Sequence, residues 1–147
     1  MIKQINKADE LLSLVLPGSI SATNNNADCG NVPFAGNLIG ILASVGVAGV
    51  LGAGGTVDLV IDILKNGVSI YGTTKLDFAT TSVVPVYVAP AVDPLALAAG
   101  DVLTLKVVSI YNGAGPTQAI DLCVSIQVRR SKQSPPAASA QGGVDAV

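Results

Sequence analysis

The sequence predicts an all-β protein, and three observations support this fold class. Residues 56–71, TVDLVIDILKNGVSIY, read as a strand, a tight turn and a returning strand. The apolar content is mainly aliphatic, since half of the residues are hydrophobic and only 3% are aromatic. Sixteen glycines and eight prolines punctuate the chain. Many short strands joined by turns are typical of a β-sandwich or a barrel, and 147 residues suffice for one domain with its own core.

The segment 56–71 is the strongest local signal. Its first half alternates with a period of two, which is the pattern of a strand with one buried face. The residues on that face are Val57, Leu59, Ile61 and Ile63. Asn66-Gly67 follows, and this dipeptide favours the positive φ angles of a tight hairpin turn. We therefore expect a β-hairpin whose second strand runs from Val68 to Tyr71.

Residues 1–31 are expected to form an N-terminal arm and loop. The first ten residues are mostly polar, and residues 11–22 fit an extended segment or a short helix that breaks at Pro17-Gly18. Residues 23–30 include three consecutive asparagines and are expected to be a loop. The apolar run 11–16 is interrupted by Ser13 and is too short for the core of a signal peptide, so we expect no secretion signal.

Residues 32–57 contain no charged side chain. A membrane-spanning helix needs about 20 continuous apolar residues, whereas each glycine here would destabilise a helix by about 1 kcal/mol. We therefore favour a strand over residues 37–45, followed by a glycine-rich loop over 46–55 that is buried or faces another subunit. That loop, GVAGVLGAGG, imitates a phosphate-binding loop, but such a loop opens a helix and this one precedes a strand.

The second half of the chain continues as strands and turns. We expect strands at 75–78, 83–88, 102–111 and 120–130, with turns at Gly100-Asp101 and residues 112–116. Pro85 makes the second of these strands an edge strand or splits it. Two sets of alternating aliphatic residues should face the core: Leu103, Leu105 and Val107, and then Leu122, Val124, Ile126 and Val128. The expected sandwich domain is 32–130, and residues 131–147 have the Pro/Ala/Gly-rich composition of a disordered tail.

Charge is scarce in this sequence. Eight basic and ten acidic residues give a net charge of −2, so the chain has no basic patch for nucleic acid. Charged residues make up 12% of the chain, against about 25% in an ordinary soluble domain. The mean hydropathy is high, at +0.59. Both values are expected where other subunits cover much of the surface, because interface cores are depleted of charge.

Candidate chemical groups are few. The chain has no histidine, which removes the commonest general base and metal ligand. Asp58 and Asp62 share a strand face, which is expected to be solvated; the alternative is a calcium site completed by Asp77 or Asp121. We assign no catalytic, cofactor-binding or metal-binding residue and expect no enzymatic activity.

For the tyrosines and for the cysteines, the sequence leaves one alternative role open. Tyr71, Tyr87 and Tyr111 are expected to pack at strand ends or interfaces, the alternative being a platform on which sugars stack. Cys29 and Cys123 fit no metal-ligand spacing, so we expect two small buried side chains, with a disulfide as the alternative.

The order of motifs resembles the β-sandwich modules of tailed-bacteriophage virion proteins, found in capsid decoration proteins and in head or tail fibres. The resemblance covers Val32 to Arg130. It rests on the runs VPFAGNLIGILASVGVAG, TVDLVIDILKNGVSIYGT, LALAAGDVLTLKVVSI and AIDLCVSIQVRR. Within these runs it rests on Pro33-Phe34-Ala35-Gly36, Lys65-Asn66-Gly67, Ala98-Ala99-Gly100-Asp101 and the closing Arg129-Arg130. The resemblance implies a jelly-roll-like antiparallel sandwich, usually a homotrimer, with a structural or adhesive role and no catalysis.

The functional expectation is a capsid decoration, or cement, protein at the surface of a virion. Its partners would be the major capsid protein and neighbouring copies of itself, with no nucleic acid and no membrane. Both terminal arms are expected to reach towards these neighbours. We favour decoration over a fibre because we expect the 147 residues to be a complete chain and see no repetitive shaft. The alternatives are a fibre or receptor-binding tip and, less favoured, a carbohydrate-binding sandwich, against which the low aromatic content argues.

Overall fold

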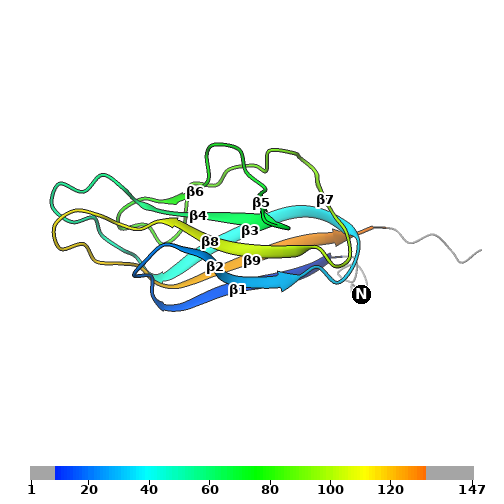
Figure 1. The fold of residues 1–147 in the computed structure, drawn as a ribbon, viewed down its shortest axis with the longest axis horizontal. Helices are drawn as coiled ribbons and strands as arrows, with labels where there is room; N and C mark the ends of the chain where they lie inside the picture. The colour runs from blue at the N-terminus through cyan, green and yellow to red at the C-terminus, as the bar shows by residue number, and fades with distance from the viewer. Residues whose placement is uncertain (1–8, 132–147) are drawn as a thin grey trace, which may run out of the picture.

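A computed structural model describes residues 9–131 as two antiparallel sheets packed face to face (Figure 1). Sheet A contains β1 (Asp9–Ser19), β9 (Ile120–Arg130), β3 (Gly36–Val47) and β7 (Leu95–Leu97), in that order. Sheet B contains β2 (Asn24–Asn31), β8 (Val102–Ser109), β4 (Leu59–Lys65) and β5 (Val68–Ser69), and β6 (Leu76–Phe78) also pairs with β4. The predicted all-β sandwich is confirmed. The expected extended arms fall largely on residues 1–8 and 132–147, which lie outside the described residues.

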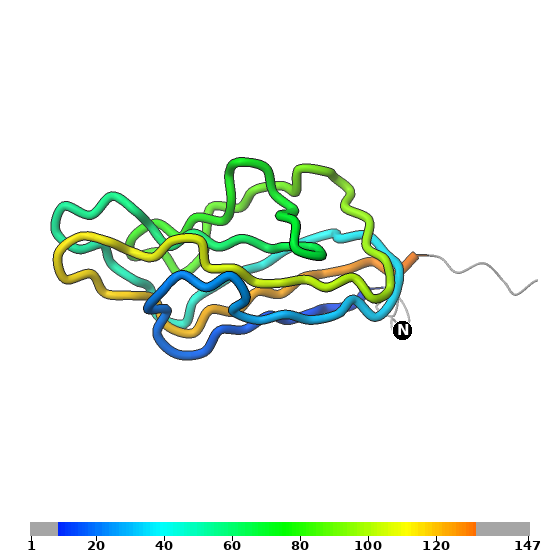
Figure 2. Tube along the Cα trace, in the orientation of Figure 1, coloured from blue at the N-terminus to red at the C-terminus, as the bar shows by residue number. Residues whose placement is uncertain are grey.

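The strands pair in reverse order along the chain. β1 pairs with β9, β2 with β8, β3 with β7 and β4 with β6. The chain is thus one long antiparallel ribbon that is rolled up, and two further pairings, of β9 with β3 and of β8 with β4, close the roll. A four-stranded and a five-stranded sheet built in this way have the topology of a jelly roll, and the trace in Figure 2 follows it.

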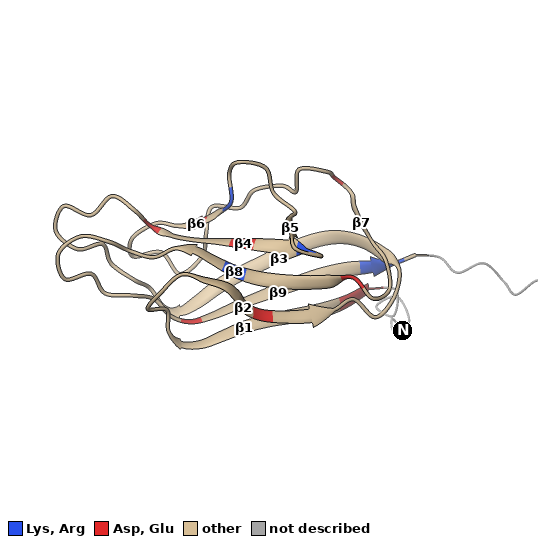
Figure 3. Ribbon diagram, viewed as in Figure 1, with Lys and Arg blue, Asp and Glu red and all other residues tan. Residues whose placement is uncertain are grey.

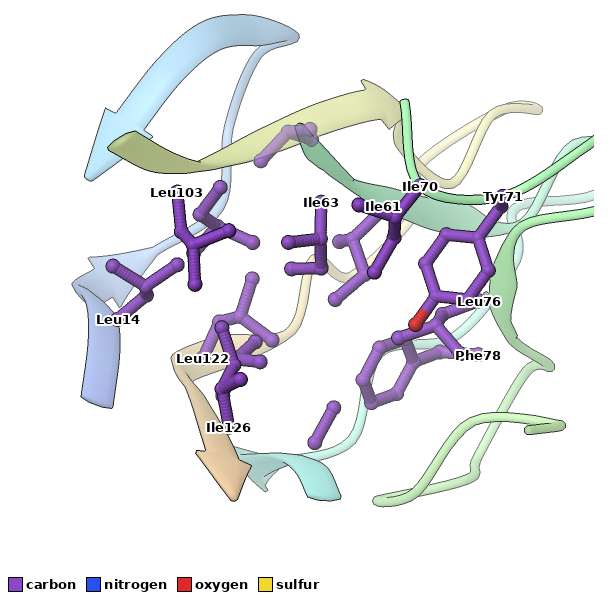
Figure 4. Close-up of a cluster of buried hydrophobic side chains, with 14 of the residues drawn as sticks. Leu14, Ile61, Ile63, Ile70, Tyr71, Leu76, Phe78, Leu103, Leu122 and Ile126 are labelled. Carbon is purple, nitrogen blue, oxygen red and sulfur yellow. The ribbon is translucent and has the colours of Figure 1, made fainter. Parts of the chain in front are cut away.

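The core lies between the sheets and is formed by the predicted alternating residues, with one exception. Val57, expected on the buried face, is 39% exposed because it lies in the loop before β4 begins at Leu59. In β9, Leu122, Val124, Ile126 and Val128 are fully buried. Leu103, Leu105 and Val107 of β8 face them from sheet B, together with Ile61 and Ile63 of β4. Figure 4 shows Leu122 and Ile126 of this cluster opposite Ile63, with Leu14 at one side and Leu76 and Phe78 at the other. Full burial of one such side chain contributes about 1.5–3 kcal/mol, so the two-residue period of these strands accounts for the layered core.

The predicted hairpin is confirmed, with a shorter second strand. Asn66 and Gly67 have φ angles of 51° and 85°, as a primed hairpin turn requires. The Asn66 side chain donates to Asp101 Oδ1 at 2.9 Å and accepts the N–H of Val102 at 2.8 Å. The turn is therefore anchored to the start of β8. β5 ends at Ser69, after which the chain folds back over β4.

The expected N-terminal arm and loop contains two sheet strands from residue 9 onward. The predicted extended segment 11–22 is confirmed as far as Ser19, where β1 ends. The helical alternative is wrong, because Leu12, Leu14 and Leu16 point towards the core from β1. The expected loop at 23–30 is wrong too, since β2 pairs there with β8. β2 is an exposed edge strand, so backbone pairing with β8 stabilises it although its sequence has no apolar alternation.

The expected strand at 83–88 is also wrong. Only an isolated bridge between Asp77 and Val86 forms in this segment. The segment connects β6 in sheet B to β7 in sheet A, so it crosses between sheets and cannot pair along its length. Pro85 adds to this because it has no N–H to donate.

Residues 32–57 form β3 and a loop, as expected in outline. β3 spans the predicted strand 37–45 and is longer by a few residues. The glycine-rich loop leads into strand β4 and not into a helix, as expected. Among the described residues, no helix is long and apolar enough to span a membrane.

The glycine-rich loop packs closely against the β8–β9 connection. Backbone bridges join Val50 to Thr117 and Ala53 to Ala114. A Cβ at Gly52 would lie 2.6 Å from the Ala114 carbonyl oxygen, and one at Gly49 would overlap the ring of Tyr111. Glycine is therefore required at these positions because another chain segment occupies the space of a side chain.

Replacing Gly49 with Ala should destabilise the fold by about 1–3 kcal/mol, since the methyl group would push into the buried Tyr111 ring. Gly72→Ala is the matched control, because no atom lies within 4 Å of its added Cβ. Chemical denaturation of both variants measures the difference. Equal stabilities would contradict the close packing of this loop.

Candidate interaction surface

The middle of the outer face of sheet A carries no charged side chain. Three rows of residues cross β1, β9 and β3 in register, and we call these nine residues the sheet A face. The rows are Val15–Cys123–Ser44, Ser13–Ser125–Leu42 and Leu11–Gln127–Gly40. Each β9 member lies between fully buried neighbours, so strand alternation directs it outward.

The shape and chemistry of this face suit protein contact. Small side chains (Cys123, Ser125, Ser44 and Gly40) occupy four of the six positions on β9 and β3. Two large apolar residues stand out from it: Leu11 and Leu42 are each 67% exposed. An exposed apolar patch with polar surroundings is characteristic of an interaction site.

Charged residues lie at one margin of the sheet A face. The next row along the strands is Asp9–Arg129–Asn37. Arg129 Nε donates to Asp9 Oδ1 at 2.9 Å, and this hydrogen bond lowers the pKa of Asp9. Arg130 forms a second ion pair with Glu10 at 3.5 Å and stacks on the ring of Phe34. An uncharged centre with a charged margin matches the charge-depleted core and polar rim of a protein interface.

The opposite end of the sandwich is uncharged. The two loops that meet there, 46–57 and 110–119, contain no Lys, Arg, Asp or Glu. Figure 3 shows these loops without charge colour at the left, and blue and red at the end where β1 begins and β9 finishes. The uncharged loops and the Asp9–Arg129 margin thus lie at opposite ends of the sandwich.

Asp62 departs from the expected solvated face, because it is buried. The chain after β5 folds over β4, so that the Ser69 hydroxyl donates to Asp62 Oδ1 at 2.7 Å. Lys75 Nζ lies 3.5 Å from Asp62 Oδ2 and compensates its charge. Asp62 is therefore a structural ion-pair partner within sheet B.

The structure does not assemble the alternative calcium site. Asp121 lies on β9 of sheet A, where its carboxylate accepts the N–H of Gly18 at 2.7 Å. Asp77 lies near Asp58 and away from that position, and burial followed by the charge of Asp58 raises the pKa of Asp77. Within residues 9–131, no group of three or more His, Cys, Asp or Glu side chains could hold a metal ion.

The three tyrosines do not form a sugar platform. Tyr71 and Tyr111 are buried, while Tyr87 is 47% exposed and bonds the backbone of Ala43. Burial, with smaller contributions from Asp58 and Asp77, raises the pKa of Tyr111 to about 12. The packing interpretation of the tyrosines is therefore confirmed for Tyr71 and Tyr111.

Neither cysteine interpretation holds. Both thiols are free, so the disulfide alternative is wrong. Cys29 is exposed on the edge strand β2, and Cys123 is partly exposed because it lies on the outer side of β9. The expectation of two core thiols fails because both residues occupy outward positions of their strands.

Comparisons with known protein families, with characterised proteins and with solved structures find no match. The expected lack of catalysis therefore stays a prediction. The sheet A face is the feature that sequence reasoning missed. Its signal was present in the polar and small residues between the inward residues of 120–130, but only the pairing with β1 and β3 shows that they form one surface.

The two buried tyrosines predict opposite stability effects. The Tyr71 hydroxyl oxygen is buried and has no hydrogen-bond partner among the described residues, whereas the Tyr111 hydroxyl donates to the Phe78 carbonyl at 2.8 Å. Tyr71→Phe should therefore leave the stability unchanged or raise it by about 1 kcal/mol, and Tyr111→Phe should lower it by about 1 kcal/mol. Thermal and urea unfolding of both variants test this. Equal losses would contradict the assigned hydroxyl environments.

The raised pKa of Asp77 predicts a pH dependence of stability. The folded state binds the proton of the Asp77 carboxyl more tightly than the unfolded state does, because in the unfolded chain this carboxyl has its usual pKa of 3.8. The free energy of unfolding should therefore fall as the pH rises from below this value through the raised pKa. Asp77→Asn removes this effect, so its stability relative to the original chain should increase between about pH 3 and pH 7.

The control for this experiment is Asp93→Asn, which replaces an exposed carboxylate in a loop. Unfolding curves across the pH range should show no comparable trend for this control. A pH-independent difference between Asp77→Asn and the original chain would contradict the prediction.

Proposed function

We propose that this protein is a virion structural protein, most specifically a capsid decoration protein that binds an assembled icosahedral shell as a symmetric oligomer. The observation that carries the proposal is the sheet A face: an uncharged surface of mostly small side chains, with Leu11 and Leu42 exposed and a charged margin. The jelly-roll strand order supports it, because the resemblance to bacteriophage virion modules implies that fold. The homotrimeric state and the major capsid protein as partner come from the same resemblance.

The scarcity of charge supports an assembled protein. A chain with 12% charged residues leaves large areas with few ionic groups, and these areas fall on the sheet A face and the loop end. Isolated in water, such surfaces favour association, since apolar area is removed from solvent when they are covered. In an assembly they become contact area with neighbours.

The mechanism follows from linkage. A protein that binds the closed lattice but not its loosened form stabilises the lattice by mass action. Repeated sites on a shell raise the effective concentration of each contact, so that modest single affinities suffice. In this mechanism no catalytic group is needed, and rigid presentation of a contact face by a two-sheet core is the contribution of the fold.

The test is the copy number of this chain, relative to the major shell protein, in purified particles of the virus that encodes it. A ratio comparable to that of the shell protein is the expected result. A small fraction would instead indicate a fibre or tail tip, and absence from particles would overturn the virion proposal.

The sheet A face predicts a specific loss of attachment. Leu42→Glu places a charge at its centre and should lower occupancy on shells at least about tenfold, equivalent to about 1.4 kcal/mol. Val68→Glu is the matched control, because Val68 is 70% exposed but lies on the β4–β5 hairpin of the other sheet. Both variants should keep the unfolding midpoint of the original chain. Co-sedimentation with shells measures occupancy, and equal binding of the two variants would exclude the sheet A face as the contact.

A further inference from the structure

A groove runs along the edge of β3, on the side away from β9. The segment 87–94 forms its other wall, and the volume is about 570 Å³. Its lining is apolar apart from one carboxylate: Ile39, Ile41 and Leu42 lie on the strand side, and Val88, Pro90 and Asp93 on the segment side. Val88 packs against the core, so this wall is attached to the sandwich.

The groove coincides with a gap in the backbone pairing of β3. β7 covers only Gly36–Leu38. Further along, the Tyr87 hydroxyl donates to the Ala43 carbonyl at 3.1 Å and accepts the Ala43 N–H at 3.2 Å, and the Val45 N–H bonds to the Val83 carbonyl at 2.9 Å. Strand alternation directs the backbone of Ile41 to the same side as those of Ala43 and Val45. Among the described residues, no strand lies beside Ile39–Leu42 on that side.

An open interval of strand edge beside apolar walls is suited to strand addition. An extended peptide can bond to the free N–H and C=O groups of such an edge, and its alternate side chains fill the apolar groove. The interval is bounded by β7 at one end and Tyr87 at the other, so it fits a short segment.

The chain itself carries a segment of this kind at its C-terminal end. The last described residue, Ser131, donates its N–H to the Ala35 carbonyl, immediately before β3 begins. Sixteen residues follow it, and they span about 50 Å when extended. Ile41 is only six residues further along β3 than Ala35, or about 20 Å. The groove is therefore within reach in the same molecule or in a neighbour.

The composition of this end also fits strand addition. Pro135 and Pro136 cannot donate to a strand ladder, whereas residues 137–147, AASAQGGVDAV, contain no further proline. Apart from Gln141 and Asp145 their side chains are Ala, Ser, Gly or Val, and Val144 and Ala146 alternate with Asp145. An alternating pair of this kind places two apolar side chains on one face of an added strand.

We propose that residues 137–147 bind in the groove beside Ile39–Leu42 as an added antiparallel or parallel strand of sheet A. This inference concerns the isolated chain and does not depend on binding to a virion. The added strand covers the one open interval of the β3 edge, in the same molecule or in a neighbouring copy.

Amide hydrogen exchange measured by NMR on the full chain tests this proposal. In a variant that ends at Pro136, the Ile41 amide should exchange at least about tenfold faster than in the full chain, because its added partner is gone. The Val45 amide, which bonds to Val83, should not change. Unchanged exchange at Ile41 after the truncation would overturn the proposal.

Two full-chain variants separate the groove from the rest of the sheet. Ile39→Glu puts a charge in the groove and should also speed exchange at Ile41, whereas Leu11→Glu, on β1 outside the groove, should not. An equal effect of both variants would contradict the location. Dilution shows which molecule supplies the groove. If protection of the Ile41 amide does not depend on protein concentration, residues 137–147 bind the groove of their own chain. If this protection is lost on dilution, they bind the groove of a neighbouring copy.

Discussion

Reverse-order strand pairing is the constraint on which the rest of this structure depends. Because β1–β4 pair in turn with β9–β6, the last strands β8 and β9 become the central strands of the two sheets. Their inward residues then form the centre of the core. The same pairing sets Val47 beside Ile120 and Asp9 beside Arg129. It thereby brings the uncharged loops together at one end and the charged strand ends together at the other.

The two outer faces of the sandwich differ in how far other segments of the described chain cover them. On sheet B, the chain after β5 folds over β4, buries Asp62 and supplies Ser69 and Lys75 to satisfy its carboxylate. On sheet A, no comparable segment of the described chain crosses β1, β9 and β3. The nine residues of the sheet A face carry no charge, and Asp121 and the Asp9–Arg129 pair lie beyond them along the strands. One face thus carries its own cover, and the other presents a surface that a partner can cover. This asymmetry, rather than any single residue, is the physical basis of the proposed role in assembly.

Local signals allowed much of the fold to be predicted from the sequence. The hairpin at Asn66-Gly67 and the strand 120–130 were found because a turn dipeptide and a two-residue period are encoded by neighbours in the chain. β2 was missed because its stability comes from pairing with β8, about 75 residues away. The burial of Asp62 was missed for the same reason: alternation places it outward, and only the later fold of the chain covers it. Local patterns therefore predicted most strands, but neither their partners nor the surfaces that pairing creates.

Both edges of sheet A are largely blocked against backbone pairing with other chains. An uncovered strand edge invites uncontrolled pairing with other chains. At the β1 edge, Asp28 accepts the Val15 N–H at 2.8 Å, and Pro17 removes a donor. At the β3 edge, β7, Tyr87 and Val83 occupy the backbone except beside Ile39–Leu42. Blocked edges together with exposed leucines on the broad face agree with the proposed association through that face. The remaining open interval is short and lined with apolar side chains, which suits one defined peptide segment better than the extended edge-to-edge pairing that leads to aggregation.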